Sequence, residues 1–82
     1  MEYKRIYSQE EVHELYEWFK DFKYEGPIDI GHGQVIKNTK YTVSRIIMQT
    51  EGHIDNPTYS GMIHQLGIIK DELVRQGLAD KQ

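Results

Sequence analysis

The sequence predicts an all-α fold, a three-helix bundle with an irregular segment between its first and second helices. Three stretches place apolar residues three and four positions apart, the spacing of one helix face. Each stretch ends at a glycine, a residue that often closes a helix: Gly26, Gly52 and Gly77. Helices with one apolar stripe bury it by packing around a shared core. We therefore expect a single domain over residues 1–82, with helices at about residues 9–25, 39–51 and 57–76.

The first helix has a well-specified start. Ser8 is the expected N-cap, and Glu11 then falls at the third helical position, where its side chain can bond back to the Ser8 amide. Gly26 and Pro27 predict the end of this helix, because proline cannot continue it. The apolar stripe of the first helix comprises Val12, Leu15, Tyr16, Phe19 and Phe22.

Residues 28–36 allow two interpretations. Ile28-Asp29-Ile30 and Gln34-Val35-Ile36 flank a Gly-His-Gly turn, so the segment is either a short β-hairpin or an ordered loop that anchors isoleucines on the helices. Two strands of three residues are marginal without a third partner. We therefore favour an irregular loop.

The second helix is predicted from its periodicity rather than its composition. The segment contains several β-branched residues, which lower helix propensity. However, Val43, Ile46 and Ile47 fall on one helical face, whereas alternation would group Arg45 with Val43 and Ile47. Either Asn38 or Thr39 can serve as the N-cap.

The third helix has the clearest pattern. Asn56 is the expected cap and Pro57 the first helical residue, a position that needs no amide proton. Gly77 and Leu78 fit a Schellman ending. Gly67 within the helix is either a site of close helix approach or an ordinary surface position. The apolar seam comprises Tyr59, Met62, Leu66, Ile69 and Leu73.

Composition excludes several classes of function. The chain has no cysteine, which rules out thiolate catalysis and thiolate-bound zinc. No stretch approaches the roughly 20 apolar residues that a spanning helix needs. The N-terminal residues lead into no apolar run of the signal-peptide type. We therefore expect a cytoplasmic protein that does not enter a membrane.

No motif predicts catalysis, a metal or a cofactor. The four histidines, His13, His32, His53 and His64, show no same-face spacing of three or four. The carboxylates fall on the solvent face of the first helix rather than across a cleft, as paired-acid catalysis would require. We therefore expect no enzymatic activity, no metal and no cofactor.

Apolar side chains left over from the core predict a protein–protein contact. Tyr41 and Met48 lie seven residues apart with Arg45 between them, on the helix face opposite Val43. Tyrosine, methionine and arginine are enriched at interface cores. Ile68 likewise points away from the seam of the third helix. The partner is either another protein or a second copy of the chain, since the first helix is rich in acids while residues 31–50 contain none.

Weak nucleic-acid binding through the second helix is the alternative. Lys37, Lys40 and Arg45 can contact phosphates, and the short connection between the last two helices is close to that of a helix-turn-helix motif. The net charge of −3 opposes this alternative, because such affinity depends largely on released counterions.

The order of motifs resembles an uncharacterised family of small bacterial domains found mostly in gut Bacteroidetes. Trp18-Phe19, residues 36–47, Asn56-Pro57-Thr58-Tyr59 and Leu66 carry the resemblance. It covers most of the chain between Glu11 and Leu73. The resemblance implies a short helical domain without an assigned activity, and it transfers no functional residue.

Overall fold

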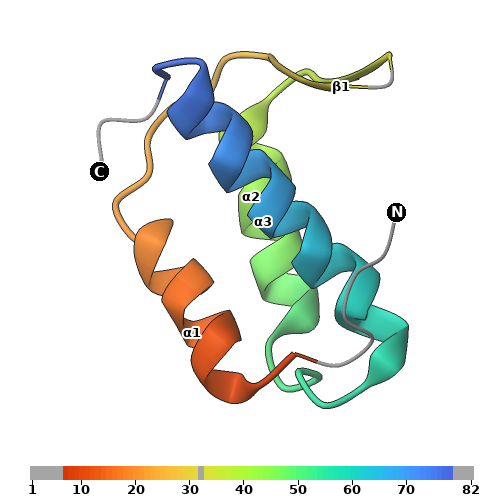
Figure 1. Ribbon diagram of the computed structural model, residues 1–82. Coiled ribbons are helices and arrows are strands. Elements are labelled where there is room, and N and C mark those ends of the chain that lie inside the picture. The colour runs from red at the N-terminus through yellow and green to blue at the C-terminus, as the bar shows by residue number, and fades with distance from the viewer. Residues whose placement is uncertain (1–6, 32, 79–82) are drawn as a thin grey trace.

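The computed structural model describes residues 7–31 and 33–78, which form three helices and a two-stranded antiparallel sheet. The prediction of an all-α bundle is therefore wrong, because the segment between the first two helices is a β-hairpin (Figure 1). No helix within these residues is long and apolar enough to cross a membrane. The elements in chain order are α1 (Gln9–Trp18), β1 (Ile28–Gly31), β2 (Gln34–Ile36), α2 (Thr39–Thr50), the 3-10 turn η1 (Pro57–Tyr59) and α3 (Ser60–Arg75).

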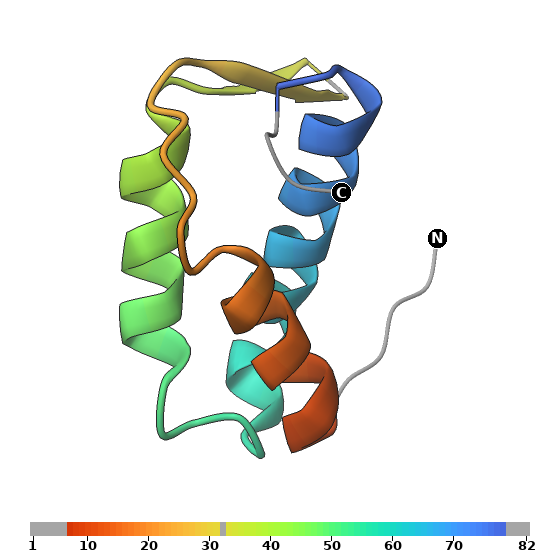
Figure 2. The ribbon, with the colours of Figure 1, turned by 90° about the vertical axis from the view of Figure 1, so that its left-hand side faces the viewer.

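The hairpin forms because a helix takes the place of the missing third strand. Ile28 pairs with Ile36, and Asp29 pairs with Val35. Ile28 is only 2 % exposed and belongs to the main core cluster. Strand β1 packs against α3, so the hairpin covers one end of the pair formed by α2 and α3 (Figures 1 and 2). Packing against a helix is sufficient to stabilise a two-stranded sheet.

A side-chain hydrogen bond also ties the hairpin to the end of α3. The Gln76 side-chain amide donates to the carbonyl oxygen of Asp29 over 3.0 Å. The Asp29 carboxylate accepts the amide proton of Gly31 at 2.8 Å, next to an irregularity in the strand register. The backbone of Asp29 therefore joins two segments that are distant in sequence.

Helix α1 ends at Trp18, well before the predicted end near residue 25. The amide of Phe19 still bonds to Leu15, but the chain then turns and runs in irregular conformation to the hairpin. The carbonyl oxygen of Gly26 accepts hydrogen bonds from the amide and the hydroxyl of Thr39, at 3.1 and 2.8 Å. A helix continued to residue 25 would not place Gly26 at the start of α2, so this tertiary contact outweighs the local helical pattern.

The other helix boundaries agree closely with the sequence. Ser8 and Glu11 form the predicted capping box, and Asn38 rather than Thr39 caps α2. At the end of α3 the amides of Gly77 and Leu78 bond to Val74 and Leu73, which is the Schellman pattern. The last helix differs at its start, because residues 57–59 form a 3-10 turn before α3 begins at Ser60.

The core lies where α2, α3 and β1 meet, with Phe19 closing it from the α1 side. Trp18 and Phe22 pack on Phe19, each with its ring edge against a ring face. All members of the core cluster are at most 5 % exposed: Phe19, Ile28, Val43, Ile46, Leu66, Ile69 and Leu73.

Candidate functional site

Two neighbouring hollows run along the exposed side of α2. The first measures about 370 Å³ and the second about 270 Å³, and Ser44 lines both of them. They are therefore two halves of one shallow depression, which we name the α1–α2 groove. Its lining residues are Tyr16, Phe19, Lys20, Glu25, Asn38, Lys40, Tyr41, Ser44, Ile47, Met48 and Glu51.

The groove has two walls. Helix α1 and the chain that follows it, through Glu25, form the first wall, and α2 forms the second. Figure 2 shows this arrangement, with the chain leaving α1 and rising beside α2 to the hairpin. Because α1 ends at Trp18, the first wall is partly irregular chain rather than helix. The early end of α1 therefore shapes the groove.

A hydrogen bond between side chains joins the two walls at one end. The hydroxyl oxygens of Tyr16 and Thr50 lie 2.6 Å apart. Thr50 is fully buried and Tyr16 is half-buried. Burial raises the pKa of the Tyr16 phenol, the hydrogen bond to Thr50 lowers it, and the nearby Glu51 carboxylate raises it; the net shift is upward. Tyr16 therefore stays neutral and holds α1 against α2 across the physiological range.

Two residues of the predicted contact line the groove and are prominently exposed. Tyr41 is 65 % exposed and Met48 is 70 % exposed. Arg45 is exposed on the same side of α2 but does not line the groove. Ile68 is half-buried on α3 and is not part of this surface. The structure thus groups three of the four predicted residues and separates the fourth.

Residues of opposite charge line each half of the groove, one from each wall. In one half these are Lys20 on the first wall and Glu51 on α2. In the other half, the signs are exchanged, with Glu25 on the first wall and Lys40 on α2. All four side chains are exposed. Within the described residues no ion pair joins them.

The three basic residues of the nucleic-acid alternative differ in their relation to the groove. Lys37, Lys40 and Arg45 are all exposed. Only Lys40 lines the groove, and Glu25 shares that half of it. The carboxylate of Glu25 would face any anionic backbone that approached Lys40 there.

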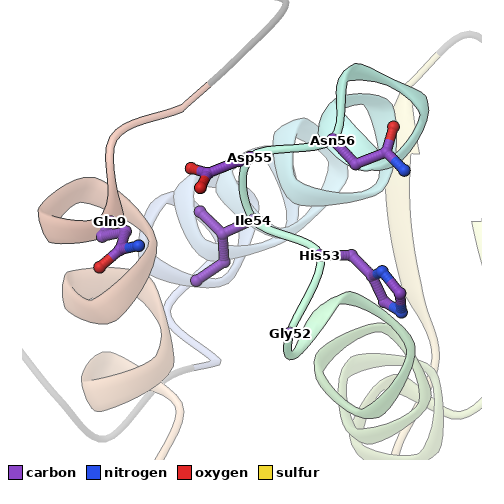
Figure 3. A pocket seen from close by; sticks show the side chains of 6 residues that line it. All are labelled: Gln9, Gly52, His53, Ile54, Asp55 and Asn56. Atoms are coloured by element: carbon purple, nitrogen blue, oxygen red, sulfur yellow. The ribbon is translucent and has the colours of Figure 1, made fainter.

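A separate hollow of about 360 Å³ lies between the start of α1 and the loop after α2. Figure 3 shows Ile54 and Asp55 turned toward Gln9, whereas the side chains of His53 and Asn56 lie on the other side of the loop. The His53 ring stacks on Tyr59 at 4.6 Å, and the Asn56 side chain caps η1. These two polar side chains therefore already have structural roles.

No described group of three or more histidine, aspartate or glutamate side chains is arranged to hold a metal ion. His13 is exposed beside Tyr16, and a ring nitrogen of His64 shares a hydrogen bond of 3.1 Å with the Tyr7 hydroxyl. His32 lies outside the described residues. The described histidines are thus dispersed over the fold.

Sequence reasoning missed part of the groove. The prediction that Phe19 belongs to the core is confirmed, but Phe19 and Tyr16 of the same predicted stripe also line the groove. No sequence pattern indicates Ser44 as a lining residue. A half-buried residue such as Tyr16 contributes both to the core and to a surface depression, and periodicity alone does not distinguish the two roles. Only the path of the chain after Trp18 reveals the first wall.

Comparisons with models of protein families, with curated proteins and with solved structures found no match to this chain.

Proposed function

We propose that this chain is a noncatalytic interaction module that binds a protein through the α1–α2 groove and the adjoining face of α2. The observation that carries the proposal is the position of Tyr41 and Met48. Both side chains are well over half exposed, and both stand at the edge of one depression. Single exposed apolar residues are common, but a pair that borders a shared depression is typical of an interaction surface.

The chemistry of the groove supports protein binding over catalysis. Its lining combines aromatic and aliphatic side chains with exposed charges at the rim, as in interfaces with an apolar centre and a polar border. Burial raises the pKa of the Tyr16 phenol, so this lining residue stays protonated near neutral pH and offers no general base there.

Site-specific photo-crosslinking tests the proposal. A photoreactive phenylalanine analogue replaces Met48 in one variant and Val74 in the control variant, in cells that produce the protein naturally. Val74 is also exposed, at 51 %, but it lies on α3 outside the groove. We expect a discrete protein adduct from position 48 only, and we expect Tyr41→Glu in the same chain to abolish it. Equal labelling from both positions, or no adduct from position 48, would contradict the proposal.

Salt-sensitive retention on duplex DNA tests the nucleic-acid alternative with the same protein. If the basic residues bind phosphates, Lys37→Gln and Lys40→Gln each reduce retention at low salt. We expect the wild type to show no retention, because the carboxylates of Glu25 and Glu51 share the groove with the nearest basic residues.

A further inference from the structure

Resting on the proposed function, we infer that the occupant of the α1–α2 groove is the same groove of a second copy of this chain. The inference starts from the charges at the rim. Going from the first wall to α2, the pair in one half of the groove reads Lys20 then Glu51. In the other half it reads Glu25 then Lys40. Positive and negative side chains thus alternate around the rim.

This alternating pattern is complementary to itself. A two-fold axis parallel to the groove places the first wall of one copy over the α2 wall of the other, at the same height along the groove. Lys20 of each copy then faces Glu51 of the other, and Glu25 of each copy faces Lys40 of the other. Each of the two pairings occurs twice, giving four attractive contacts around the rim.

A two-fold axis across the groove is the competing arrangement, and it also pairs opposite charges at the rim. This axis places each wall of one copy over the same wall of the other copy, running in the opposite direction. Lys20 of one copy then faces Glu25 of the other, and Glu51 faces Lys40. However, Arg45 lies midway along α2 and is exposed. Stacking α2 on α2 in reverse order brings the two Arg45 guanidinium groups toward each other, and like charges at an interface are unfavourable. Arg45 therefore favours the axis along the groove.

The apolar side chains fit the same axis. Met48 stands on the α2 wall in the half of the groove that also contains Tyr16 and Phe19 on the first wall. The two-fold operation brings Met48 of one copy toward the half-buried Tyr16 ring of the other, and a thioether beside an aromatic ring is a favourable contact. Tyr41 follows in the other half, beside the first wall of the second copy.

The available area sets the expected affinity. A stable interface of standard size takes roughly 800 Å² from each partner, which is about one seventh of the chain surface of 5730 Å². The groove is shallow and its rim contacts are exposed to solvent, so each ion pair adds little. We expect a reversible dimer with a dissociation constant of about 1–100 µM.

Charge exchange across the groove tests the inference by sedimentation velocity at about 100 µM chain, where such a dimer is populated. Lys20→Glu and Glu51→Lys each place like charges at two symmetric contacts. We expect either variant alone to dimerise roughly tenfold more weakly than the wild type. An equimolar mixture should dimerise like the wild type, because the new glutamate of one chain then faces the new lysine of the other.

A second mixture distinguishes the two axes. Under the axis across the groove, Lys20 faces Glu25, so Lys20→Glu would be rescued by mixing with Glu25→Lys and not with Glu51→Lys. We expect rescue by Glu51→Lys alone. Rescue by Glu25→Lys instead would overturn the arrangement inferred here.

Two controls accompany this experiment. Lys37→Glu and Asp71→Lys make the same charge changes at exposed positions outside the groove lining, and each should dimerise like the wild type. Recovery of dimers on mixing shows that the single variants remain folded.

A wild-type chain that is monomeric at this concentration would overturn the inference, as would charge exchange without effect. Neither outcome touches the proposed function, which fails only if crosslinking from position 48 is absent or unspecific. A groove-specific adduct with a different protein would retain the proposed function and reject the second copy as its occupant.

Discussion

The side-chain hydroxyls of Tyr16 on α1 and Thr50 on α2 share a hydrogen bond. The two oxygens lie 2.6 Å apart, and Thr50 Oγ1 also lies 2.9 Å from the carbonyl oxygen of Ile46. Thr50 therefore takes part in both of these contacts, whereas Tyr16 takes part in one of them. This difference makes the two residues unequal as targets of mutation.

Thr50→Val should destabilise the fold more than Tyr16→Phe. The tyrosine substitution removes one hydrogen bond and leaves Thr50 bonded to Ile46, at a cost of about 0.5–1.5 kcal/mol. The threonine substitution removes both bonds from a fully buried position, at a cost of about 1–3 kcal/mol. Urea unfolding monitored by circular dichroism measures both values. Thr58→Val, at an exposed position, is the control, and the reverse order of the two costs would contradict the two bonds assigned to Thr50.

Stability should decline above pH 10 more steeply in the wild type than in Tyr16→Phe. Burial, opposed by the Thr50 bond and aided by Glu51, raises the pKa of Tyr16 above its ordinary value of 10.0. The folded state thus favours the protonated phenol, which adds to the free energy of unfolding. This added stability is fully present below the unfolded pKa. It is lost as the pH rises from 10.0 through the folded pKa. Urea midpoints that fall in parallel for the two proteins from about pH 9 to about pH 11 would contradict the shift.

The hairpin should be an integral part of the core. Ile28→Ala removes a side chain that is 2 % exposed, and we expect a loss of about 2–5 kcal/mol. Val35→Ala on the opposite strand removes one that is 58 % exposed, and its effect should lie within about 0.5 kcal/mol of zero. Thermal and urea unfolding of the two variants give the comparison. Similar small effects would show that the hairpin is not docked on α3.

Two glycine-to-alanine substitutions should change the stability of the fold in opposite directions. A Cβ built at Gly67 meets nothing within 4 Å, so close helix approach does not explain this residue. Gly67→Ala should stabilise α3 by about 1 kcal/mol. Gly52 also has open space around it, but its φ of +81° strains any other residue. Gly52→Ala should therefore destabilise by about 1–2 kcal/mol, and melting temperatures that shift in the same direction would contradict this account.

Local signals predicted the helix starts because each start is set by a few adjacent residues. Each start depends on a cap next to its first turn: Ser8 with Glu11 at α1, Asn38 at α2, and Asn56 with Pro57 at η1. These residues supply side chains or backbone geometry to the turn that follows. Such contacts span two or three residues and are visible in any sequence. The ends set by Gly52 and Gly77 were equally local, since both adopt positive φ angles.

The remainder of the fold depends on contacts between distant residues. Gly26 looked like a third glycine stop, yet its φ is not positive, and its carbonyl bonds to Thr39. A Cβ at Gly26 would also lie 2.6 Å from the hydroxyl oxygen of Tyr24. Likewise the hairpin depends on α3, which follows it in sequence. Because of these tertiary contacts, the first helix ends earlier than predicted and the fold includes a sheet. Local propensity does not indicate either feature.

The candidate site divides in the same way. The exposed face of α2 could be predicted, because Tyr41 and Met48 fall opposite the core by helix geometry alone. The groove beside it could not, since its first wall depends on where the chain runs after Trp18. Ile68 was assigned to the surface by the same geometry but is half-buried.

The hydrogen bond from Gln76 to Asp29 bears on the order in which the chain folds. It spans 47 residues, from the hairpin to the end of α3. An isolated hairpin of this size is marginal in water, so it gains stability only after the last helix has formed and docked. Long loops close slowly compared with helix formation. A nascent chain should therefore remain without its sheet until the segment through Gln76 is free to fold.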